Sequence, residues 1–197
     1  MSAHENLEHA EHAQHASGSN KKIALLISVL ALFLAFSETF GKNAQTAALS
    51  YNVAANDLWA FYQSKTIRIT VLTTATEQLQ IEAERAADPA LKARLEKTIA
   101  DWKKRAARYE SDPKLREGRK ELNERAQEAD HRREVALARY HNYEVASAAF
   151  QIGIVLASAE VITAMAALGW FAGALGAIGL AFTALGLWAP HAVHLFG

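Results

Sequence analysis

Three stretches of this sequence are apolar over the length that a membrane-spanning helix requires. The first runs from Ile23 to Phe40, which is about 18 residues, and its only charged residue is Glu38. The other two run from Ala148 to about Trp170 and from Phe171 to about Pro190, and their only formal charge is Glu160. Because one crossing takes roughly 20 residues, we expect three transmembrane helices.

Each membrane assignment has an alternative. A cleaved signal peptide would also place basic residues such as Lys21 and Lys22 before an apolar core. The acidic, histidine-bearing segment in front and the length of the core favour an anchor. A buried hairpin of a soluble protein would also explain the last two stretches, but the central part of the chain has too little apolar surface to cover it. We expect the turn between them at Gly169–Gly173, where glycine permits a tight bend and aromatic residues suit the interface.

Charge and composition limit the functions that remain. The chain has 21 Lys and Arg residues and 21 Asp and Glu residues, so it presents no net field for nucleic acid, and we expect no nucleic-acid partner. It has no cysteine, which excludes disulfides and thiol chemistry. We also expect no cofactor. All Lys and Arg residues except Lys21 and Lys22 lie between Lys42 and Arg139, in a segment that we expect to be extramembrane.

The central segment has two strong signals for helix starts. Asp88-Pro89 and Asp112-Pro113 each place an acidic N-cap before a proline at the first helical position. They predict helices at about 44–87, 89–111 and 113 onward, the last running into the second crossing. Apolar residues recur at alternating three- and four-residue steps from Tyr51 to Ala86, with Lys65 and Thr76 interrupting the stripe. Such narrow seams are typical of coiled coils, and they suggest that other copies of the chain complete the burial.

The fold class is therefore an all-α membrane protein with three transmembrane helices and a long, coiled-coil-like helical hairpin between the first and second. The expected parts are a disordered His/Glu-rich tail at 1–20, a first transmembrane helix at 21–41, an extramembrane stalk at 42–147, a transmembrane hairpin at 148–190 and a short tail at 191–197.

Two motifs resemble one known family. The stretch from Asn56 to Arg68, NDLWAFYQSKTIR, is similar to the WAxYQxKxIK core of a bacterial membrane family catalogued as domain of unknown function 4337. The stretch from Phe150 to Ser158, FQIGIVLAS, is similar to that family's QIxIVLAS entry into its second membrane helix. The resemblance implies the same order of elements and implies no activity. This chain lacks the arginine cluster that relatives usually carry between the last two crossings.

The orientation rests on opposing signals. Lys21 and Lys22 favour a cytoplasmic N-terminus, which puts the central segment in the periplasm of a bacterial inner membrane. The basic residues of the central segment favour the reverse, although the positive-inside rule is weak for long loops. We expect a multi-pass inner-membrane protein with a periplasmic central segment.

Two carboxylates lie within the apolar stretches, where a charge is costly and tends to face a bundle interior or a cavity. Glu160 is about ten residues into its stretch, so we expect it near mid-membrane, on a face shared with Gly153 and Ala157. It could serve as a proton or cation site between helices, or as a protonated carboxyl that makes an interhelical hydrogen bond. Glu38 could join such a site or lie at the interface near Lys42.

Small residues at four-residue spacing predict close helix packing in the third crossing. They are Gly169, Gly173, Ala177 and Ala181, with Gly176, Gly179 and Gly186 on an adjoining face. A pore lining is the alternative. Packing is the more common use of such a pattern, and we expect it to build a homo-oligomer.

Two polar clusters have both a structural and a functional interpretation. In the tail, His4, His9, His12 and His15 lie among acidic residues and could bind zinc, nickel or copper, but a solvated disordered segment is the simpler interpretation, so we expect no metal site. In the family-like motif, Trp59, Tyr62, Gln63 and Lys65 could form a recognition patch. A packed aromatic junction between the outgoing and returning helices is favoured.

No nucleophile–base pair, phosphate loop or metalloprotease motif is readable, so we expect a protein that is not an enzyme. The leading hypothesis is a self-associating integral membrane scaffold with a projecting helical stalk. Its expected partners are the lipid bilayer, other copies of the chain and, through the stalk, other envelope or membrane proteins. The alternative is a small ion or proton channel, or a transport accessory, that uses Glu160 and Glu38.

Overall fold

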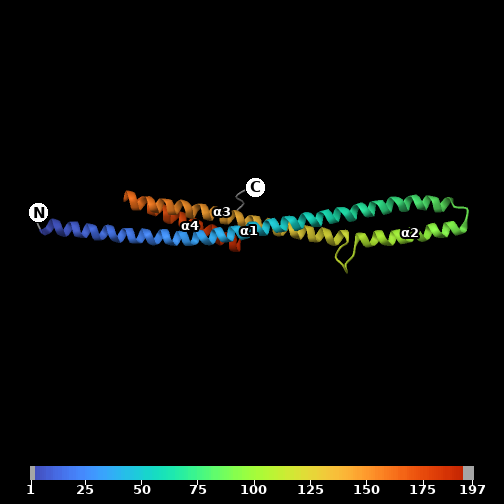
Figure 1. Ribbon diagram of the computed structural model, residues 1–197, viewed down its shortest axis with the longest axis horizontal. Coiled ribbons are helices and arrows are strands. Elements are labelled where there is room, and N and C mark those ends of the chain that lie inside the picture. Colours follow the sequence, from blue (N-terminus) through green and yellow to red (C-terminus); the bar gives the residue numbers. More distant parts are fainter. Residues whose placement is uncertain (1–2, 193–197) are drawn as a thin grey trace. The chain divides into compact units, whose positions relative to one another are not determined.

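A computed structural model describes the backbone of residues 3–192 and the side chains of residues 21–192. The described backbone is mostly helical and contains no strand. It forms α1 (Ala3–Arg85), α2 (Pro89–Glu110), α3 (Arg119–Thr163) and α4 (Ala166–Trp188), as Figure 1 shows. Three of these helices, α1 from Lys21 onward, α3 and α4, are long and apolar enough to cross a membrane. The all-α class predicted from the sequence is therefore confirmed.

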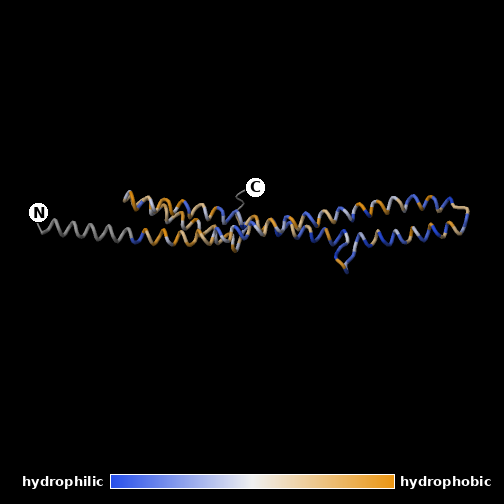
Figure 2. The backbone as a smooth tube through the Cα atoms, viewed as in Figure 1, coloured by the Kyte–Doolittle hydropathy of each residue, from blue (hydrophilic) through white to orange (hydrophobic). Residues whose placement is uncertain are grey.

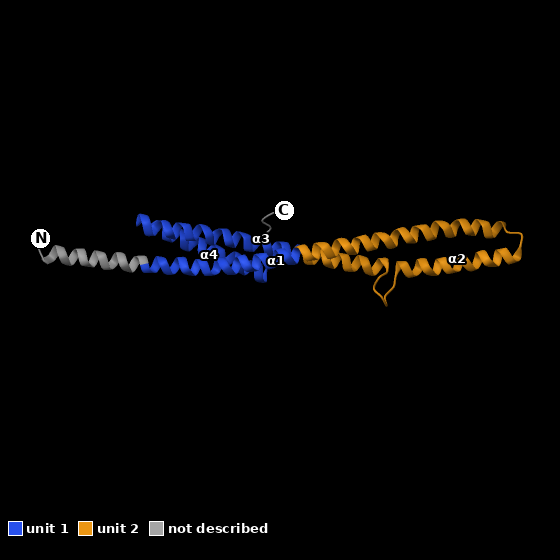
Figure 3. Cartoon of the chain, in the orientation of Figure 1, with its two compact units in different colours: residues 1–48, 134–197 blue, residues 49–133 orange. Residues whose placement is uncertain are grey.

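The chain divides into two compact units, which Figure 3 colours separately. Unit 1 contains residues 1–48 and 134–197, and unit 2 contains residues 49–133. Figure 2 shows that, in unit 1, apolar residues dominate α4, the coloured part of α1 and the end of α3, whereas α2 in unit 2 is largely hydrophilic. The side chains of residues 1–20 lie outside the described part, so the predicted disordered tail and the metal-binding alternative for its four histidines stay predictions. The short C-terminal tail predicted at 191–197 also stays a prediction.

α1 is one continuous helix from the first apolar stretch into unit 2. It has no proline, and it stops at Arg85, three residues before the Asp88-Pro89 pair. The Asp88 carboxylate accepts a hydrogen bond from the Ala90 amide at 2.9 Å and so caps α2, as the sequence predicts. The helix predicted at 89–111 is thereby confirmed to within one residue.

The helix start predicted at Asp112-Pro113 is wrong, because α3 begins at Arg119. Asp112 and Pro113 start a single turn, in which the Arg116 amide donates to the Asp112 carbonyl at 2.8 Å. Arg116 then takes a left-handed conformation with φ 54°, which ends the turn. The Glu121 side chain reaches back to accept hydrogen bonds from the Ser111 hydroxyl at 2.6 Å and the Asp112 amide at 3.1 Å. These bonds hold residues 111–118 as a loop.

Acid is expected to open this loop. The hydrogen bond from Ser111 holds the pKa of Glu121 below its usual value of 4.5, and the neighbouring Arg108 lowers the pKa of Asp112. A carboxyl with a lowered pKa contributes stability above its unfolded pKa and loses it as the pH falls through the folded pKa. Exchange protection of the Asp112 amide, corrected for the intrinsic rate, should therefore fall below about pH 4. Glu121→Gln should remove most of that acid response, and an unchanged response in this variant would contradict the assignment.

The turn between the last two apolar helices also differs from the prediction. It lies at Ala164 and Met165, not at Gly169–Gly173, which is helical in α4. Ala164 adopts φ 54°, and the Thr163 hydroxyl accepts a hydrogen bond from the Met165 amide at 3.4 Å. A small residue tolerates the left-handed conformation at modest cost, so glycine is not required here. Because the turn comes earlier, Glu160 lies in the last turn of α3 and not at its middle.

Candidate functional site: two helical interfaces

The core of unit 1 is built from glycines on α4 that receive large side chains from α1 and α3. A Cβ at Gly176 would lie 2.7 Å from a Leu30 methyl carbon, and one at Gly179 would lie 2.6 Å from the Phe150 ring. A Cβ at Gly186 would likewise meet the Tyr143 ring at 2.7 Å. The missing Cβ atoms therefore create the holes into which these side chains insert.

The small residues predicted to pack fall into two groups. Gly153 and Ala157 on α3 are buried, and Gly169 faces the Glu160 carboxylate so closely that a Cβ would collide with it. In contrast, Gly173 has open space where a Cβ would be, and Ala177 and Ala181 are exposed in the single chain. Packing within the chain therefore uses the adjoining glycine face of α4, and it leaves the Gly173 face uncovered.

Polar contacts tie the three helices of unit 1 together. The hydroxyl groups of Ser37 on α1 and Thr183 on α4 share a hydrogen bond of 3.0 Å. The buried Asn142 side chain donates to the Pro190 carbonyl at 3.0 Å and so fixes the chain that follows α4. Interhelical bonds of this kind are worth about 1 kcal/mol in a membrane environment.

Two exposed tryptophans mark the ends of the apolar part of unit 1. Trp170 and Trp188 on α4 are 83% and 81% exposed. At a rise of 1.5 Å per residue they are about 27 Å apart along the helix axis, close to the ~30 Å of a hydrocarbon core. Tryptophan is enriched at both membrane interfaces, so the pair matches the two edges of one crossing.

The two carboxylates lie at opposite ends of this apolar layer. Glu160 faces Gly169, next to Trp170, and its Oε2 atom is buried without a hydrogen-bond partner. Glu38 lies within one turn of Gly41, which contacts the same Tyr143 side chain as Gly186 near the Trp188 end. The Glu38 carboxylate accepts a hydrogen bond from the Gln151 amide at 3.3 Å. Glu160 therefore lies at the end of α3, whereas the expected position near mid-membrane assumes that the helix continues to about Trp170.

Glu38 also borders a polar groove between α1 and α3. The groove has a volume of about 470 Å³, and its polar lining includes Lys42, Tyr140 and Glu144. Lys42 follows the apolar stretch of α1 directly, which is the position expected for a residue at a membrane interface.

Unit 2 is held by a polar junction around the family-like motif. The Trp59 indole nitrogen on α1 donates to the Asp130 carboxylate on α3 at 2.9 Å. Asp130 also pairs with Arg133 at 3.3 Å, and Arg133 donates to the Asn52 side chain at 3.3 Å. The Tyr62 ring packs edge-on against Trp59, with 5.5 Å between ring centroids. These contacts fix the register of the two antiparallel helices.

Lys65 of the motif is a buried cation between aromatic rings. It is 7% exposed, and its ammonium nitrogen lies 4.8 Å from the Phe61 centroid and 5.2 Å from that of Tyr109 on α2. Its methylene chain fills the seam while the ring faces attract its charge. Gln63 is exposed, so it is the motif residue that does not join the junction.

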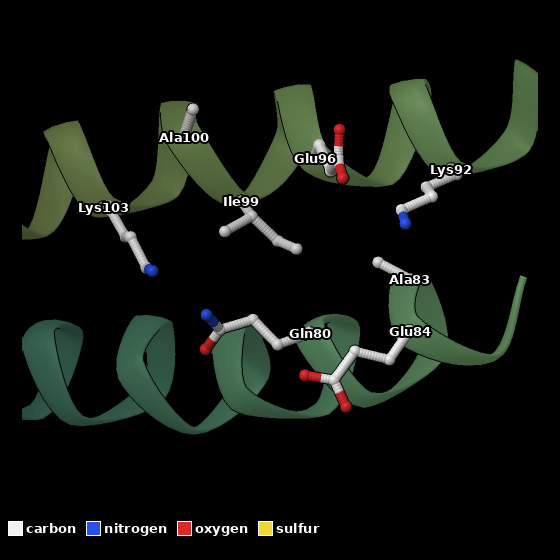
Figure 4. A pocket seen from close by; sticks show the side chains of 8 residues that line it. All are labelled: Gln80, Ala83, Glu84, Lys92, Glu96, Ile99, Ala100 and Lys103. Carbon is white, nitrogen blue, oxygen red and sulfur yellow. The ribbon is translucent and has the colours of Figure 1, made fainter. Parts of the chain in front are cut away.

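The far end of unit 2 packs more thinly. A cavity of about 370 Å³ separates α1 from α2, and Figure 4 shows Ala83 and Ile99 facing each other across it. Gln80, Glu84, Glu96 and Lys103 surround them. Alternating charges around a short apolar seam are typical of a solvated coiled-coil edge and do not form a catalytic arrangement. Among the residues with described side chains, no group of three His, Asp or Glu residues is placed to hold a metal ion.

These features define a helical protein with three candidate membrane spans, in which a long helical hairpin separates the first span from the second. The chain belongs to the family described as "Domain of unknown function (DUF4337)", whose model matches residues 19–189. No curated protein and no solved structure matches the chain. The family resemblance inferred from the two motifs is thus confirmed.

Proposed function

We propose that this protein is a non-enzymatic, self-associating integral membrane scaffold with a helical stalk on a three-crossing base. The observation that carries this proposal is the continuity of α1, which runs unbroken from Lys21 in the first apolar stretch to Arg85 in unit 2. A single long helix without an internal break is the kind of element from which a spacer or scaffold is built. The polar groups of the Trp59 junction also bond to one another and so serve the hairpin itself.

Self-association is supported by the uncovered face of α4. Gly173, Ala177 and Ala181 recur every four residues and are exposed in the single chain. Lipid can cover such a face, but small residues at this spacing permit close contact between helix backbones, which stabilises helix pairs in membranes. The face therefore fits a second copy of the chain in the bilayer.

Gly173→Ile is expected to weaken the oligomer by about tenfold or more, because the side chain blocks close approach of the helices. Native mass analysis of protein extracted in mild detergent measures the change. Ala174→Ile is the matched control, since Ala174 is also exposed but lies about 100° further around the helix. Equal oligomers in wild type and both variants would contradict a contact through this face.

A channel or transport accessory is the second candidate, favoured by the buried and unpartnered Oε2 atom of Glu160. The position of Glu38 at the opposite end of the apolar layer argues against one shared ion site, because no charged residue lies between them in the bilayer. Proton flux through purified protein in liposomes, abolished by Glu160→Gln, would favour the channel. A defined oligomer without flux would favour the scaffold.

We further propose a bacterial inner-membrane location with a cytoplasmic N-terminus and unit 2 in the periplasm. The pair Lys21 and Lys22 supports this orientation, since basic residues next to a span stay on the cytoplasmic side. In that compartment the stalk is available to other envelope or membrane proteins as well as to further copies.

A further inference from the structure

The part of α1 in unit 2 carries a second apolar stripe, opposite the seam that holds the hairpin together. The seam residues recur in a strict three–four alternation, and its buried members include Ala55, Lys65, Thr76 and Ala83. In a helix with that seam, the heptad position farthest from it recurs every seven residues. Here it is occupied by Val53, Ala60, Ile67, Thr74 and Ile81.

These outward positions are strongly exposed in the single chain. Val53 is 59% exposed, Ile67 62% and Ile81 50%, and their neighbours Leu49 and Val71 are 62% and 61% exposed. Branched aliphatic side chains at the position of a coiled coil that normally faces water are unfavourable unless a partner covers them. We call the set Leu49, Val53, Ala60, Ile67, Val71, Thr74 and Ile81 the outer stripe.

The other helices of unit 2 do not share this feature. The equivalent outward position holds Lys97 and Lys104 on α2, and Glu124 and His131 on α3. Polar residues at these positions are what a solvated coiled-coil surface requires. In unit 2, the outward positions of α2 and α3 therefore suit contact with water, whereas the outward position of α1 is mostly apolar.

Charge is also nearly absent beside the outer stripe. Among the exposed positions between residues 49 and 81, the charged residues are Asp57, Arg68 and Glu77. The rest are aliphatic or uncharged polar residues such as Asn56, Gln63 and Gln78. Two identical surfaces can meet along such a stripe without bringing rows of like charges together.

We propose that the outer stripe pairs with the outer stripe of a second copy of this chain, in parallel and in register. The proposal rests on the self-association proposed above and names its surface in the stalk. A second copy supplies a helix of the same length and the same seven-residue spacing. Copies inserted in one bilayer with the same topology also leave it in the same chain direction, which makes the pairing parallel and sets equal residues opposite each other.

This pairing explains the unequal distribution of charge in unit 2. The α1 helices form the interior of the assembly, where Val53, Ile67 and Ile81 are covered on one side by the partner while the hairpin seam covers the other. The α2 and α3 helices, with their Lys, Arg and Glu residues, lie outside and face water. A strict repeat of seven residues predicts a left-handed supercoil for the paired α1 helices.

Single cysteines test the proposal cleanly, because the natural chain has none. In membranes containing the full-length protein, mild oxidation should convert Ile67→Cys to a covalent dimer about tenfold more efficiently than Leu91→Cys, since a disulfide needs Cα atoms within about 7 Å. Leu91 is the matched control because it is an aliphatic residue on α2 and is 48% exposed. Equal yields from the two variants would overturn the proposal.

Register and direction need a second arm of the experiment. The Val53→Cys and Ile81→Cys variants, carrying different tags, are expressed together and oxidised. Each variant should form disulfide dimers with itself, and almost no disulfide should join a Val53→Cys chain to an Ile81→Cys chain. A dominant mixed dimer would show an antiparallel pair and would overturn the parallel arrangement. Ile67→Glu should weaken the oligomer by about tenfold or more while leaving the helical content unchanged, because Ile67 is 62% exposed within the chain.

The outcomes separate this inference from the proposed function. If native mass analysis gives an oligomer for the wild type but Ile67→Cys does not cross-link, the stalk contact is wrong and the scaffold stands. If the wild type is monomeric, both proposals fail.

Discussion

Gly179→Leu is expected to disrupt the three-helix core of unit 1. The Cβ alone would lie 2.6 Å from the Phe150 ring, and the rest of the leucine side chain needs still more space. Phe150 cannot move aside easily, because it is fully buried and stacks on Phe33 with 6.0 Å between ring centroids. Overpacking of this kind costs about 3 kcal/mol. Thermal unfolding of the purified protein in detergent should show a lowered midpoint.

Gly173→Leu provides the matched control for that prediction. It makes the same substitution on the same helix, at a site with open space around the would-be Cβ. It should leave the unfolding midpoint nearly unchanged once both proteins are compared in the same oligomeric state. Equal destabilisation by the two variants would contradict the packing of α4 through its Gly179 face.

Asp130→Ala is expected to loosen the junction of unit 2. The substitution removes the acceptor of the Trp59 indole and the ion-pair partner of Arg133 together. Hydrogen bonds to charged groups contribute about 2 kcal/mol, and the Trp59 donor would be left without a partner. Amide hydrogen exchange along residues 52–62 should accelerate by about tenfold or more.

A double-mutant cycle isolates the Trp59–Asp130 contact. Trp59→Phe removes the donor and keeps an aromatic ring. In that background, Asp130→Ala should lower the free energy of unfolding by about 1 kcal/mol less than it does in the wild type. Asp57→Ala is the surface control, since Asp57 is exposed on the same helix. Additive effects of Trp59→Phe and Asp130→Ala would show that the two side chains do not interact.

The two Asp-Pro pairs show how far local sequence signals reach. Both predict a helix start, and only Asp88-Pro89 gives one. At Asp112-Pro113 the first turn forms, but the Glu121 carboxylate, nine residues away, captures the Asp112 amide and holds a loop instead. A contact at that distance depends on where α3 begins, which no local pattern reveals.

The membrane hairpin shows a similar limit. Glycines at 169–173 predict a turn, but these residues are helical in α4 and the chain reverses at Ala164. Gly169 instead gives room to the Glu160 carboxylate, and Gly173 has open space beside it. Gly169 thus lies at a close helix contact, and the turn is formed by Ala164 in a left-handed conformation. A turn at 169–173 would also put Glu160 near the middle of its helix, whereas it lies in the last turn of α3.

The stalk seam was more predictable than its partners. Its three–four spacing is visible in the sequence, whereas Lys65 and Thr76 looked like interruptions. Both are buried, and Lys65 is accommodated because Phe61 and Tyr109 flank its ammonium group. Asp130 and Tyr109 could not be found as partners of the motif, since their position depends on the register of helices far apart in sequence.

Native mass spectrometry of the full-length wild-type chain, released from lipid nanodiscs, tests the scaffold proposal most directly. Self-association through the uncovered α4 face and the outer stripe predicts one defined oligomer as the main species, which persists when the protein is diluted. A chain that remains monomeric at every concentration in the bilayer would contradict it.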